Sequence, residues 1–436
     1  MLGTAFKSFV ESLDAAPPVS IRYNPKKVSV PAGMPVPWCE TGRYLTKRPI
    51  FTLDPFFHAG AYYVQEASSM FLEQAIRQTI DTNKPLKVLD LCAAPGGKST
   101  HALSILSPDS LLVSNEAIRN RVPALVENIQ KWGTANVIVT NNDPAHFQRL
   151  PSFFDLAIID APCSGEGLFR KEPESMNQWS ARNVDLCSLR QRRIIQDVWP
   201  ALKAGGVLIY STCTYNEKEN MDNLLRLREQ HEVEFLPLAL KKEWGVVETV
   251  KGLCFGYQFY PHLVMGEGFF LTAIRKGGNN PQRTTKVRDG LKYPSGTELN
   301  KLKEWVDIPE SKCFFLHDKQ VRMIPLSLKH ELMELQQALH LIEVGTAVAE
   351  IAHSKLIPEH ALALSDGLRK DCFRRISLNT ENALGYLRKD AFTVDAGKTG
   401  FGLIDHEGLG LGWVNVLSNR VNNMYPPSRR IRMKQN

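Results

Sequence analysis

Five short apolar runs alternate with helix-like stretches between residues 64 and 276, and this alternation constrains the fold of the chain. The runs are predicted strands, at 87–90, 111–114, 137–140, 155–160 and 206–210. Amphipathic, helix-like stretches accompany them, such as Ala67–Thr79 and Arg121–Trp132. Strands that alternate with helices at this spacing are joined by right-handed crossovers. The pattern therefore predicts an α/β fold built on a doubly wound parallel sheet.

Two cysteines directly follow the last two of these strands. Cys163 lies in Asp160–Gly165 (DAPCSG), and Cys213 lies in Ser211–Tyr215 (STCTY). Open α/β sheets place their ligands beyond the carboxyl ends of the strands, so both thiols are expected at one rim. The residues alone leave three uses open, which are covalent catalysis, a metal site and a redox pair.

The first strand runs into a glycine turn and a helix, at Val88–Thr100. Gly96 and Gly97 allow a ligand to approach the backbone, and the following helix offers free amide groups. A phosphate-binding P-loop would need glycine where this chain has Cys92, so its Gly-Lys-Ser ending is half a match. Because Asp160 could hold magnesium, a P-loop-like NTPase remains an alternative.

Acidic residues close three successive strands of the predicted sheet. Glu116 follows Gly96 by roughly 20 residues, the spacing at which a carboxylate accepts hydrogen bonds from ribose hydroxyls. Asp143 follows the third strand, where it could accept a hydrogen bond from an adenine amino group, and Asp160 closes the fourth. The set favours a nucleoside with a ribose diol as the ligand.

Three blocks together resemble the signature blocks of the Sun-type RNA cytosine-5 methyltransferases. They are Leu89–Lys98 (LDLCAAPGGK), Asp160–Gly167 (DAPCSGEG) and Ser211–Tyr215 (STCTY), and the resemblance extends over Pro17–Lys276. The ending Leu409–Pro426 resembles the carboxyl-terminal extension of the bacterial RsmF-like branch. In that branch a PUA-like RNA-binding domain follows the catalytic domain, and the substrate is 16S ribosomal RNA.

The resemblance implies a class I S-adenosylmethionine-dependent methyltransferase fold with a Rossmann-like sheet, and S-adenosyl-L-methionine as cofactor. Cytosine carbon 5 is a weak nucleophile, so a thiolate must first add at carbon 6. By resemblance Cys213 attacks and Cys163 assists breakdown of the adduct, although the residues alone do not choose between the thiols. Asp160 would hydrogen-bond the cytosine ring, and Lys98 is the nearest motif cation. The residues expected to bind the cofactor are Cys92, Ala93, Ala94, Pro95, Gly96, Gly97, Lys98, Glu116, Asp143 and Asp160.

Composition shifts divide the 436 residues into units. We expect a small RNA-binding-like unit at 1–63, the catalytic domain at 64–276, a linker at 277–290, an intermediate α+β domain at 291–375 and a PUA-like RNA-binding domain at 376–436. Glycine-punctuated strands are predicted in the last unit, at 400–405 and 409–416.

The net charge of +7 favours a polyanionic partner, here 16S ribosomal RNA or the small ribosomal subunit. No apolar run is long enough for a membrane span and no signal peptide is evident, so we expect a cytoplasmic protein without membrane contact. No Cys-x-x-Cys pair or cysteine-histidine cluster is visible, which predicts no metal. The remaining thiols are expected to be ordinary small hydrophobic side chains, at Cys39, Cys187, Cys254, Cys313 and Cys372.

Several cations are candidates for RNA phosphate contacts, including Arg170, Lys171, Arg190 and Arg193. A non-catalytic RNA-binding or ribosome-assembly protein on the same scaffold is a further alternative. The intact thiols, the acidic strand ends and the glycine turn argue against it.

Overall fold

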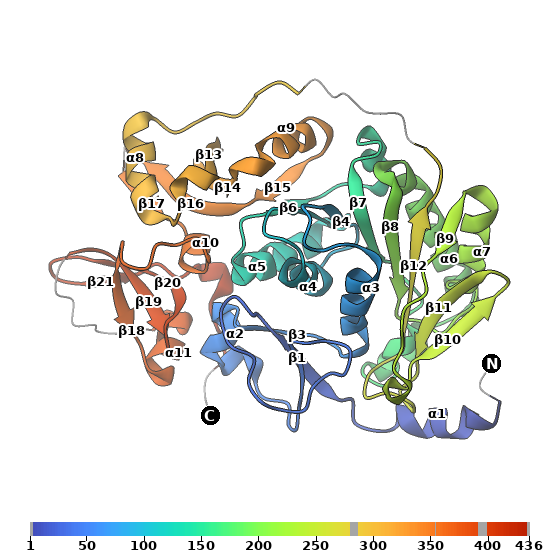
Figure 1. Ribbon diagram of the computed structural model, residues 1–436. Coiled ribbons are helices and arrows are strands. Elements are labelled where there is room, and N and C mark those ends of the chain that lie inside the picture. The colour runs from blue at the N-terminus through green and yellow to red at the C-terminus, as the bar shows by residue number, and fades with distance from the viewer. Residues whose placement is uncertain (1–2, 280–286, 354, 391–398, 434–436) are drawn as a thin grey trace.

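The computed structural model describes residues 3–279, 287–353, 355–390 and 399–433. Its centre is a ten-stranded sheet in the order β10-β11-β12-β8-β7-β4-β5-β6-β15, with β9 beside β12 (Figure 1). The parallel strands are β4 (Lys87–Asp90), β5 (Leu111–Asn115), β6 (Val137–Thr140), β7 (Phe154–Asp160) and β8 (Leu202–Thr212). The antiparallel strands are β9 (Val233–Phe235), β10 (Val247–Lys251), β11 (Cys254–Phe259), β12 (Phe269–Lys276) and β15 (Leu341–Val344). The predicted doubly wound sheet is confirmed, with every predicted strand in it.

Helices cover both faces of this sheet because alternate strand residues point to opposite sides. Val88 packs in one apolar core with α3 (Leu72–Thr79), α4 (Gly97–Ile105) and α5 (Val122–Trp132). Its neighbour Leu89 packs in a second core. The helices of that second core are α6 (Ala181–Val198), α7 (Met221–Gln230) and α9 (Lys329–Ala338). Burial on both faces explains why the strands are almost continuously apolar.

Part of the predicted intermediate unit belongs to this central layer. β15 pairs antiparallel with β6, and α9 shares the second core with the catalytic helices. The rest of the unit is α8 (Gly296–Trp305) and a four-stranded sheet in the order β13-β14-β16-β17. Its strands are β13 (Lys312–His317), β14 (Gln320–Pro325), β16 (Thr346–Ala352) and β17 (Lys355–Pro358). Half of the predicted linker 277–290, at 280–286, lies outside the described residues.

The amino-terminal unit is a three-stranded antiparallel sheet preceded by a short helix. It comprises α1 (Phe6–Leu13), β1 (Val19–Tyr23), β2 (Gly42–Leu45), α2 (Pro55–Ala59) and β3 (Tyr62–Val64). A buried arginine joins it to the central domain, because Arg22 donates hydrogen bonds to Thr100 Oγ1 at 2.7 Å and to the Gly97 carbonyl at 3.2 Å. The unit therefore lies directly against the helix that follows the glycine turn.

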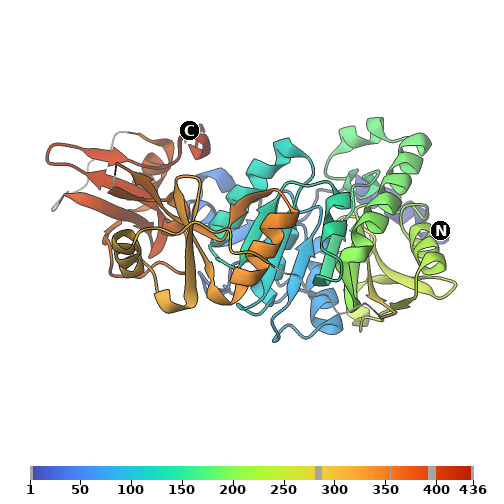
Figure 2. The same cartoon turned by 90° about the horizontal axis from the view of Figure 1, so that it is seen from above.

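The carboxyl-terminal unit is a sheet in the order β18-β19-β20-β21. It contains β18 (Arg374–Ser377), β19 (Gly400–His406), β20 (Leu409–Val416) and β21 (Val421–Asn423), with α10 (His360–Ala363) before it and α11 (Thr380–Arg388) within it. The two predicted glycine-punctuated strands are confirmed as β19 and β20. Seen from above, these strands lie at one end of an elongated molecule and α1 with the green and yellow segments at the other (Figure 2). Among the described residues no helix is long and apolar enough to cross a membrane.

Candidate active site

The two motif cysteines lie side by side where β7 and β8 end. Because these strands are parallel neighbours, with Asp160 opposite Ser211, the segments that follow them meet at one rim. The Sγ atoms of Cys163 and Cys213 are 3.0 Å apart, and the backbone amide of Cys213 lies 3.3 Å from Cys163 Sγ. The sequence predicted both thiols at one rim of the sheet, and in the structure they are in direct contact.

Gly167 fixes the backbone that carries Cys213. Its amide donates a 2.8 Å hydrogen bond to the Cys213 carbonyl. A Cβ atom at Gly167 would lie 2.2 Å from the Gly268 carbonyl oxygen and 2.9 Å from that of Cys213. Only glycine permits this approach, which explains the last glycine of the DAPCSGEG block.

Two carboxylates hold the loops on which the thiols lie. Glu219 accepts hydrogen bonds from the Ser164 amide and from Gln191 Nε2, both at 2.9 Å. Glu166 accepts them from Thr214 Oγ1 at 2.9 Å and from the Tyr215 amide at 3.1 Å. Neither role was predicted from the sequence, although Glu166 lies inside the motif block and Glu219 follows Cys213 by six positions.

Lys98 and Asp160 form an ion pair beside the thiols. Lys98 Nζ is 2.7 Å from Asp160 Oδ2, while Ser211 Oγ donates a 2.8 Å hydrogen bond to Asp160 Oδ1. Burial lowers the pKa of Lys98, but the Asp160 carboxylate outweighs it, so the pKa is raised above its ordinary value. Lys98 therefore pairs with the same carboxylate that the P-loop alternative would use to hold magnesium.

Three further groups near the site have raised pKa values, namely Cys163, Asp90 and Cys92. The contact with Cys213, together with burial, raises the pKa of Cys163 well above its ordinary value. Burial also raises the pKa of Asp90 to about 7, although Ser99 Oγ donates a 2.7 Å hydrogen bond to it. Burial raises the pKa of Cys92 in the same way.

The glycine turn leads into α4, and side chains from a neighbouring segment donate hydrogen bonds to its carbonyl groups. Gly96 has a φ of +112°, a conformation that favours glycine, at the amino-terminal cap of α4. Arg121 NH2 donates a 2.7 Å hydrogen bond to the Ala94 carbonyl, and Asn128 Nδ2 donates one of 2.8 Å to the Pro95 carbonyl. The Ala93 amide donates to the Asn115 carbonyl at 2.8 Å, so it is not available to a ligand.

The two acids that follow β5 and β6 differ in their environments. Glu116 is 3% exposed, and its Oε1 accepts a 2.8 Å hydrogen bond from the Ile118 amide. Its Oε2 lies 3.3 Å from Arg121 NH1 and accepts no hydrogen bond among the described residues. The Asp143 side chain is 47% exposed and has both oxygens engaged, by the Ala145 amide and by Arg193. Glu116 therefore has a buried acceptor atom to offer a ligand, and Asp143 does not.

A cavity of ≈ 520 Å³ at this rim connects these groups. Among the predicted site residues it is lined by Cys92, Ala94, Glu116, Asp143, Asp160, Cys163 and Cys213. Five others lie outside its lining, namely Ala93, Pro95, Gly96, Gly97 and Lys98. Lys98 nevertheless acts on the cavity through Asp160. Arg190 and Arg193, candidates for RNA contacts, also line it.

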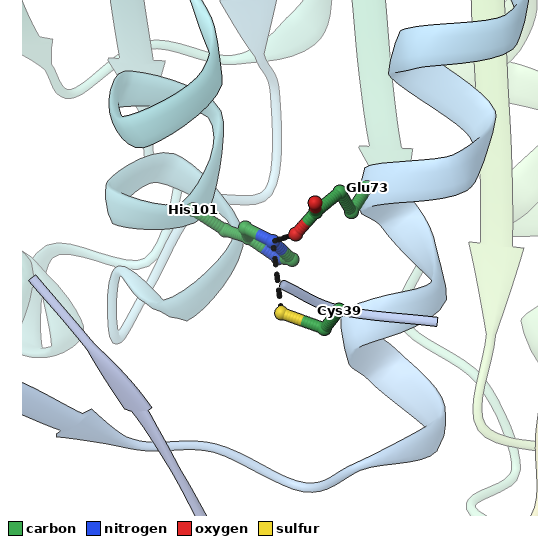
Figure 3. Close-up of side chains that lie close together, drawn as sticks. All are labelled: Cys39, Glu73 and His101. Atoms are coloured by element: carbon green, nitrogen blue, oxygen red, sulfur yellow. Dashed lines mark hydrogen bonds and ion pairs between the residues drawn. The ribbon is translucent and has the colours of Figure 1, made fainter. Parts of the chain in front are cut away.

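Two expectations about individual residues are wrong. Arg170 is not an exposed RNA-binding cation, because it is 9% exposed and forms a 3.0 Å ion pair with Glu267. The expectation that no cysteine and histidine cluster together is also wrong. Cys39 Sγ lies 3.7 Å from His101 Nε2, and that nitrogen lies 3.1 Å from Glu73 Oε2 (Figure 3). The chain separates Cys39 from His101 by 62 positions, so no local spacing reveals the contact.

The doubly wound sheet, the glycine turn after β4 and the acid after β5 define a class I methyltransferase. Solved structures of methyltransferases have the same fold. A methyltransferase homolog protein from Pyrococcus horikoshii is 27% identical with a TM-score of 0.54, over 63% of this chain and 91% of that one. The structure of NSun6 from the same organism, 19% identical with a TM-score of 0.53, has the same fold over 63% of this chain and 94% of its own.

Three family models match successive parts of the chain. They describe the N-terminal domain of 16S rRNA methyltransferase RsmF over residues 1–67, the 16S rRNA methyltransferase RsmB/F over 78–275 and the methyltransferase RsmF PUA domain over 373–431. The Ribosomal RNA small subunit methyltransferase F of Aliivibrio fischeri is 34% identical over 90% of this chain and 84% of its own length. That of Vibrio vulnificus is 31% identical over 93% and 90%. The chain belongs to the RsmF family of RNA methyltransferases.

Proposed function

We propose that this protein methylates carbon 5 of a cytosine in 16S ribosomal RNA, using S-adenosyl-L-methionine and a covalent bond between Cys213 and the base. The observation that carries the proposal is the pair of thiols 3.0 Å apart on the wall of the rim cavity. Nucleophilic addition to carbon 6 needs only one thiol. A second thiol can take part in the later step, in which the covalent adduct breaks down. The names of the relatives, which are small subunit rRNA methyltransferases, support the substrate.

The residues at the glycine turn fit the proposed cofactor. Oε2 of Glu116, which accepts no hydrogen bond among the described residues, is a buried acceptor suited to a ribose hydroxyl, and Cys92 and Ala94 line the same cavity. Asp160 contacts Lys98 of the glycine-turn helix and Ser211 of the segment that carries Cys213. When bound, S-adenosylmethionine supplies an activated methyl group on a sulfonium. The solved structure of NSun6 from Pyrococcus horikoshii contains SFG, an analogue of that cofactor.

Cys213 is the proposed nucleophile. Only a thiolate attacks efficiently, and a nearby cation favours that form. Lys98 Nζ lies 2.7 Å from Asp160 Oδ2, and Asp160 lines the same cavity as Cys213, so a cation is held directly behind the acid beside the thiols. Addition of Sγ to carbon 6 of cytosine makes carbon 5 an enamine carbon, which is nucleophilic enough to accept the methyl group. Asp160, held by Ser211 and Lys98, is placed to hydrogen-bond the ring as charge develops on it.

Cys163 is the proposed helper in product release. Once carbon 5 carries the methyl group, its proton must leave before the bond between Cys213 Sγ and carbon 6 can break. Cys163 is half-buried, lines the cavity and lies 3.0 Å from Cys213 Sγ, so it is placed beside the bond that must break during release.

We assign RNA binding to the terminal units and to the cations on the cavity wall. The match to an RsmF PUA domain at 373–431 and the net charge of +7 support this assignment. The domain boundaries 63, 276, 290 and 375 remain predictions, as does a cytoplasmic location, which a ribosomal substrate would require.

The function is tested by methyl transfer to 16S RNA. The purified chain with radiolabelled S-adenosylmethionine should label cytosine in 16S RNA, either free or in the small subunit. Bisulfite sequencing of ribosomal RNA from cells with and without the gene should then show one or more 5-methylcytosines that disappear with the gene. If every cytosine mark in 16S RNA persisted, the substrate assignment would be refuted.

A further inference from the structure

The cluster of Cys39, Glu73 and His101 lies away from the rim cavity, inside the seam between the amino-terminal unit and the central domain (Figure 3). Cys39 comes from the loop before β2, Glu73 from α3 and His101 from α4. All three residues are at most 4% exposed. One ligand atom from each, Sγ, Oε2 and Nε2, falls within 4.8 Å of the other two.

These three atoms converge on one another, and Cys39 Sγ has a further, longer contact of 3.9 Å with Thr41 Oγ1. If Nε2 carries the proton, it can donate to Glu73 Oε2 at 3.1 Å but is then not an acceptor for the thiol at 3.7 Å. If Nε2 carries no proton, its lone pair faces the negatively charged Glu73 carboxylate at 3.1 Å, which is unfavourable. His101 Nδ1 has no hydrogen-bond partner among the described residues, so the polar contacts of the ring converge on Nε2. Converging sulfur, nitrogen and carboxylate atoms are the arrangement that binds a cation.

Two of the three separations are close to those of a tetrahedral zinc site, and the third, from Sγ to the carboxylate, is within 4.8 Å. Bond lengths of about 2.3 Å to sulfur, about 2.0 Å to nitrogen and about 2.1 Å to oxygen place pairs of ligand atoms about 3.4 to 3.6 Å apart. The observed Sγ–Nε2 and Nε2–Oε2 distances of 3.7 and 3.1 Å differ from these values by a few tenths of an ångström. Side-chain rotation alone can absorb such a difference.

Neighbouring groups hold one oxygen of the Glu73 carboxylate by hydrogen bonds. Glu73 Oε1 accepts a 3.0 Å hydrogen bond from Arg77 Nε and a 3.4 Å one from the Glu40 amide. Oε1 is thereby occupied and Oε2 is left to face the cluster, as in metal sites whose carboxylate ligands are themselves hydrogen-bonded. Cys39, Glu73 and Arg77 also line a surface depression, through which an ion and a water ligand can enter.

We infer that Cys39, Glu73 and His101 bind one zinc ion, with water as the fourth ligand, which fastens the amino-terminal unit to α3 and α4. Thiolate, imidazole and carboxylate together are a donor set that zinc accepts and that magnesium and calcium do not favour. Because α4 begins at the glycine turn, the ion would hold the helix that carries Lys98. The inference does not depend on the proposed methyl transfer.

The test uses the full-length chain and zinc itself. After expression with zinc and exhaustive dialysis, elemental analysis by mass spectrometry should give about one zinc per wild-type chain. Cys39→Ser and His101→Gln should each lower this to less than about a tenth. Cys372→Ser, which alters a half-buried thiol on the carboxyl-terminal side of the molecule, should keep the wild-type content. Zinc retained at the wild-type level by Cys39→Ser would overturn the site.

A metal titration of the wild-type chain tests the site even if the variants fail to fold. Cobalt added to chelator-treated wild-type protein should produce a thiolate-to-cobalt charge-transfer band that saturates at about one equivalent. Zinc should also raise the midpoint of thermal unfolding by at least about 3 °C. If wild-type protein shows neither bound zinc nor a saturable thiolate–cobalt band, the inference is wrong, whatever the variants do.

Discussion

Two clusters among the described residues bring a cysteine into contact with another reactive group, and they are built in different ways. Cys163 and Cys213 follow the adjacent parallel strands β7 and β8, and both line the ≈ 520 Å³ cavity. Cys39, Glu73 and His101 come from a loop and two helices and lie within the packed seam behind the sheet. In the rim cluster the adjacent cation, Lys98, is paired with Asp160. In the seam cluster Arg77 pairs with the outer oxygen of Glu73.

The difference separates chemistry on a substrate from attachment of one unit to another. A thiol that adds to a nucleobase must be reachable, and strand ends at the rim of an α/β sheet supply such positions. A buried set of sulfur, nitrogen and oxygen atoms cannot reach RNA but can surround an ion. Changes at the rim should therefore alter methyl transfer, whereas changes in the seam should alter metal content and stability.

The largest effect is expected for Cys213→Ala. Without the thiolate, carbon 5 is not activated, so methyl transfer should fall by at least about 10³-fold, the scale on which removal of a nucleophile acts. Radiolabel incorporation into 16S RNA measures the loss. Cys372→Ser is the matched control and should retain wild-type turnover. Wild-type turnover by Cys213→Ala would assign the attack to another group.

Lys98→Met should have the next largest effect. It removes the cation held behind the acid beside the thiols and leaves the Asp160 carboxylate without its 2.7 Å partner. We expect kcat to fall by about 10²-fold, as for loss of one preorganised charge. The equilibrium affinity for S-adenosylmethionine, measured by calorimetry, should change far less. A loss confined to cofactor affinity would mean that Lys98 serves the cofactor and not the thiols.

Glu116→Gln should act on cofactor binding and spare the chemical step. Loss of a charged acceptor for a ribose hydroxyl should raise the KM for S-adenosylmethionine by about 10-fold, with kcat nearly unchanged. Asp143→Asn is the comparison variant, because Asp143 is half-exposed and both of its oxygens are already engaged. We expect a smaller change in KM there. Equal changes in the two variants would contradict the distinction between the two acids.

The smallest effect is a pH dependence at Asp90. Burial raises its pKa to about 7, so between about pH 4 and pH 7 the folded state keeps a proton that the unfolded state releases. This stabilisation is complete at low pH and is lost as pH rises to 7, by up to about 1.4 kcal/mol per unit. The thermal midpoint of Asp90→Asn relative to wild type should therefore be higher by a few degrees at pH 8 than at pH 5. Parallel curves for the two proteins would contradict the raised pKa.

The sequence predicted the sheet well because its strands are buried on both faces and read as continuous apolar runs. The rim thiols were also predictable, since each directly follows such a run and strand ends of a parallel sheet converge. β15 was not predicted in the central sheet, because Leu341–Val344 joins β6 across 200 intervening residues of chain. Arg170 was misjudged because its partner, Glu267, is 97 positions away. The contact of Cys39 with His101 escaped prediction for the same reason.

The most direct test of the central claim is the fate of the Cys163→Ala variant with 16S RNA and S-adenosylmethionine. If Cys213 attacks and Cys163 helps release, the variant should accumulate a covalent protein–RNA adduct that migrates slowly on a denaturing gel. After nuclease and protease digestion, mass spectrometry should place a methylated cytidine nucleotide on the peptide that contains Cys213. Normal turnover without an adduct, or a nucleotide attached to any other residue, would contradict the division of labour between the two thiols.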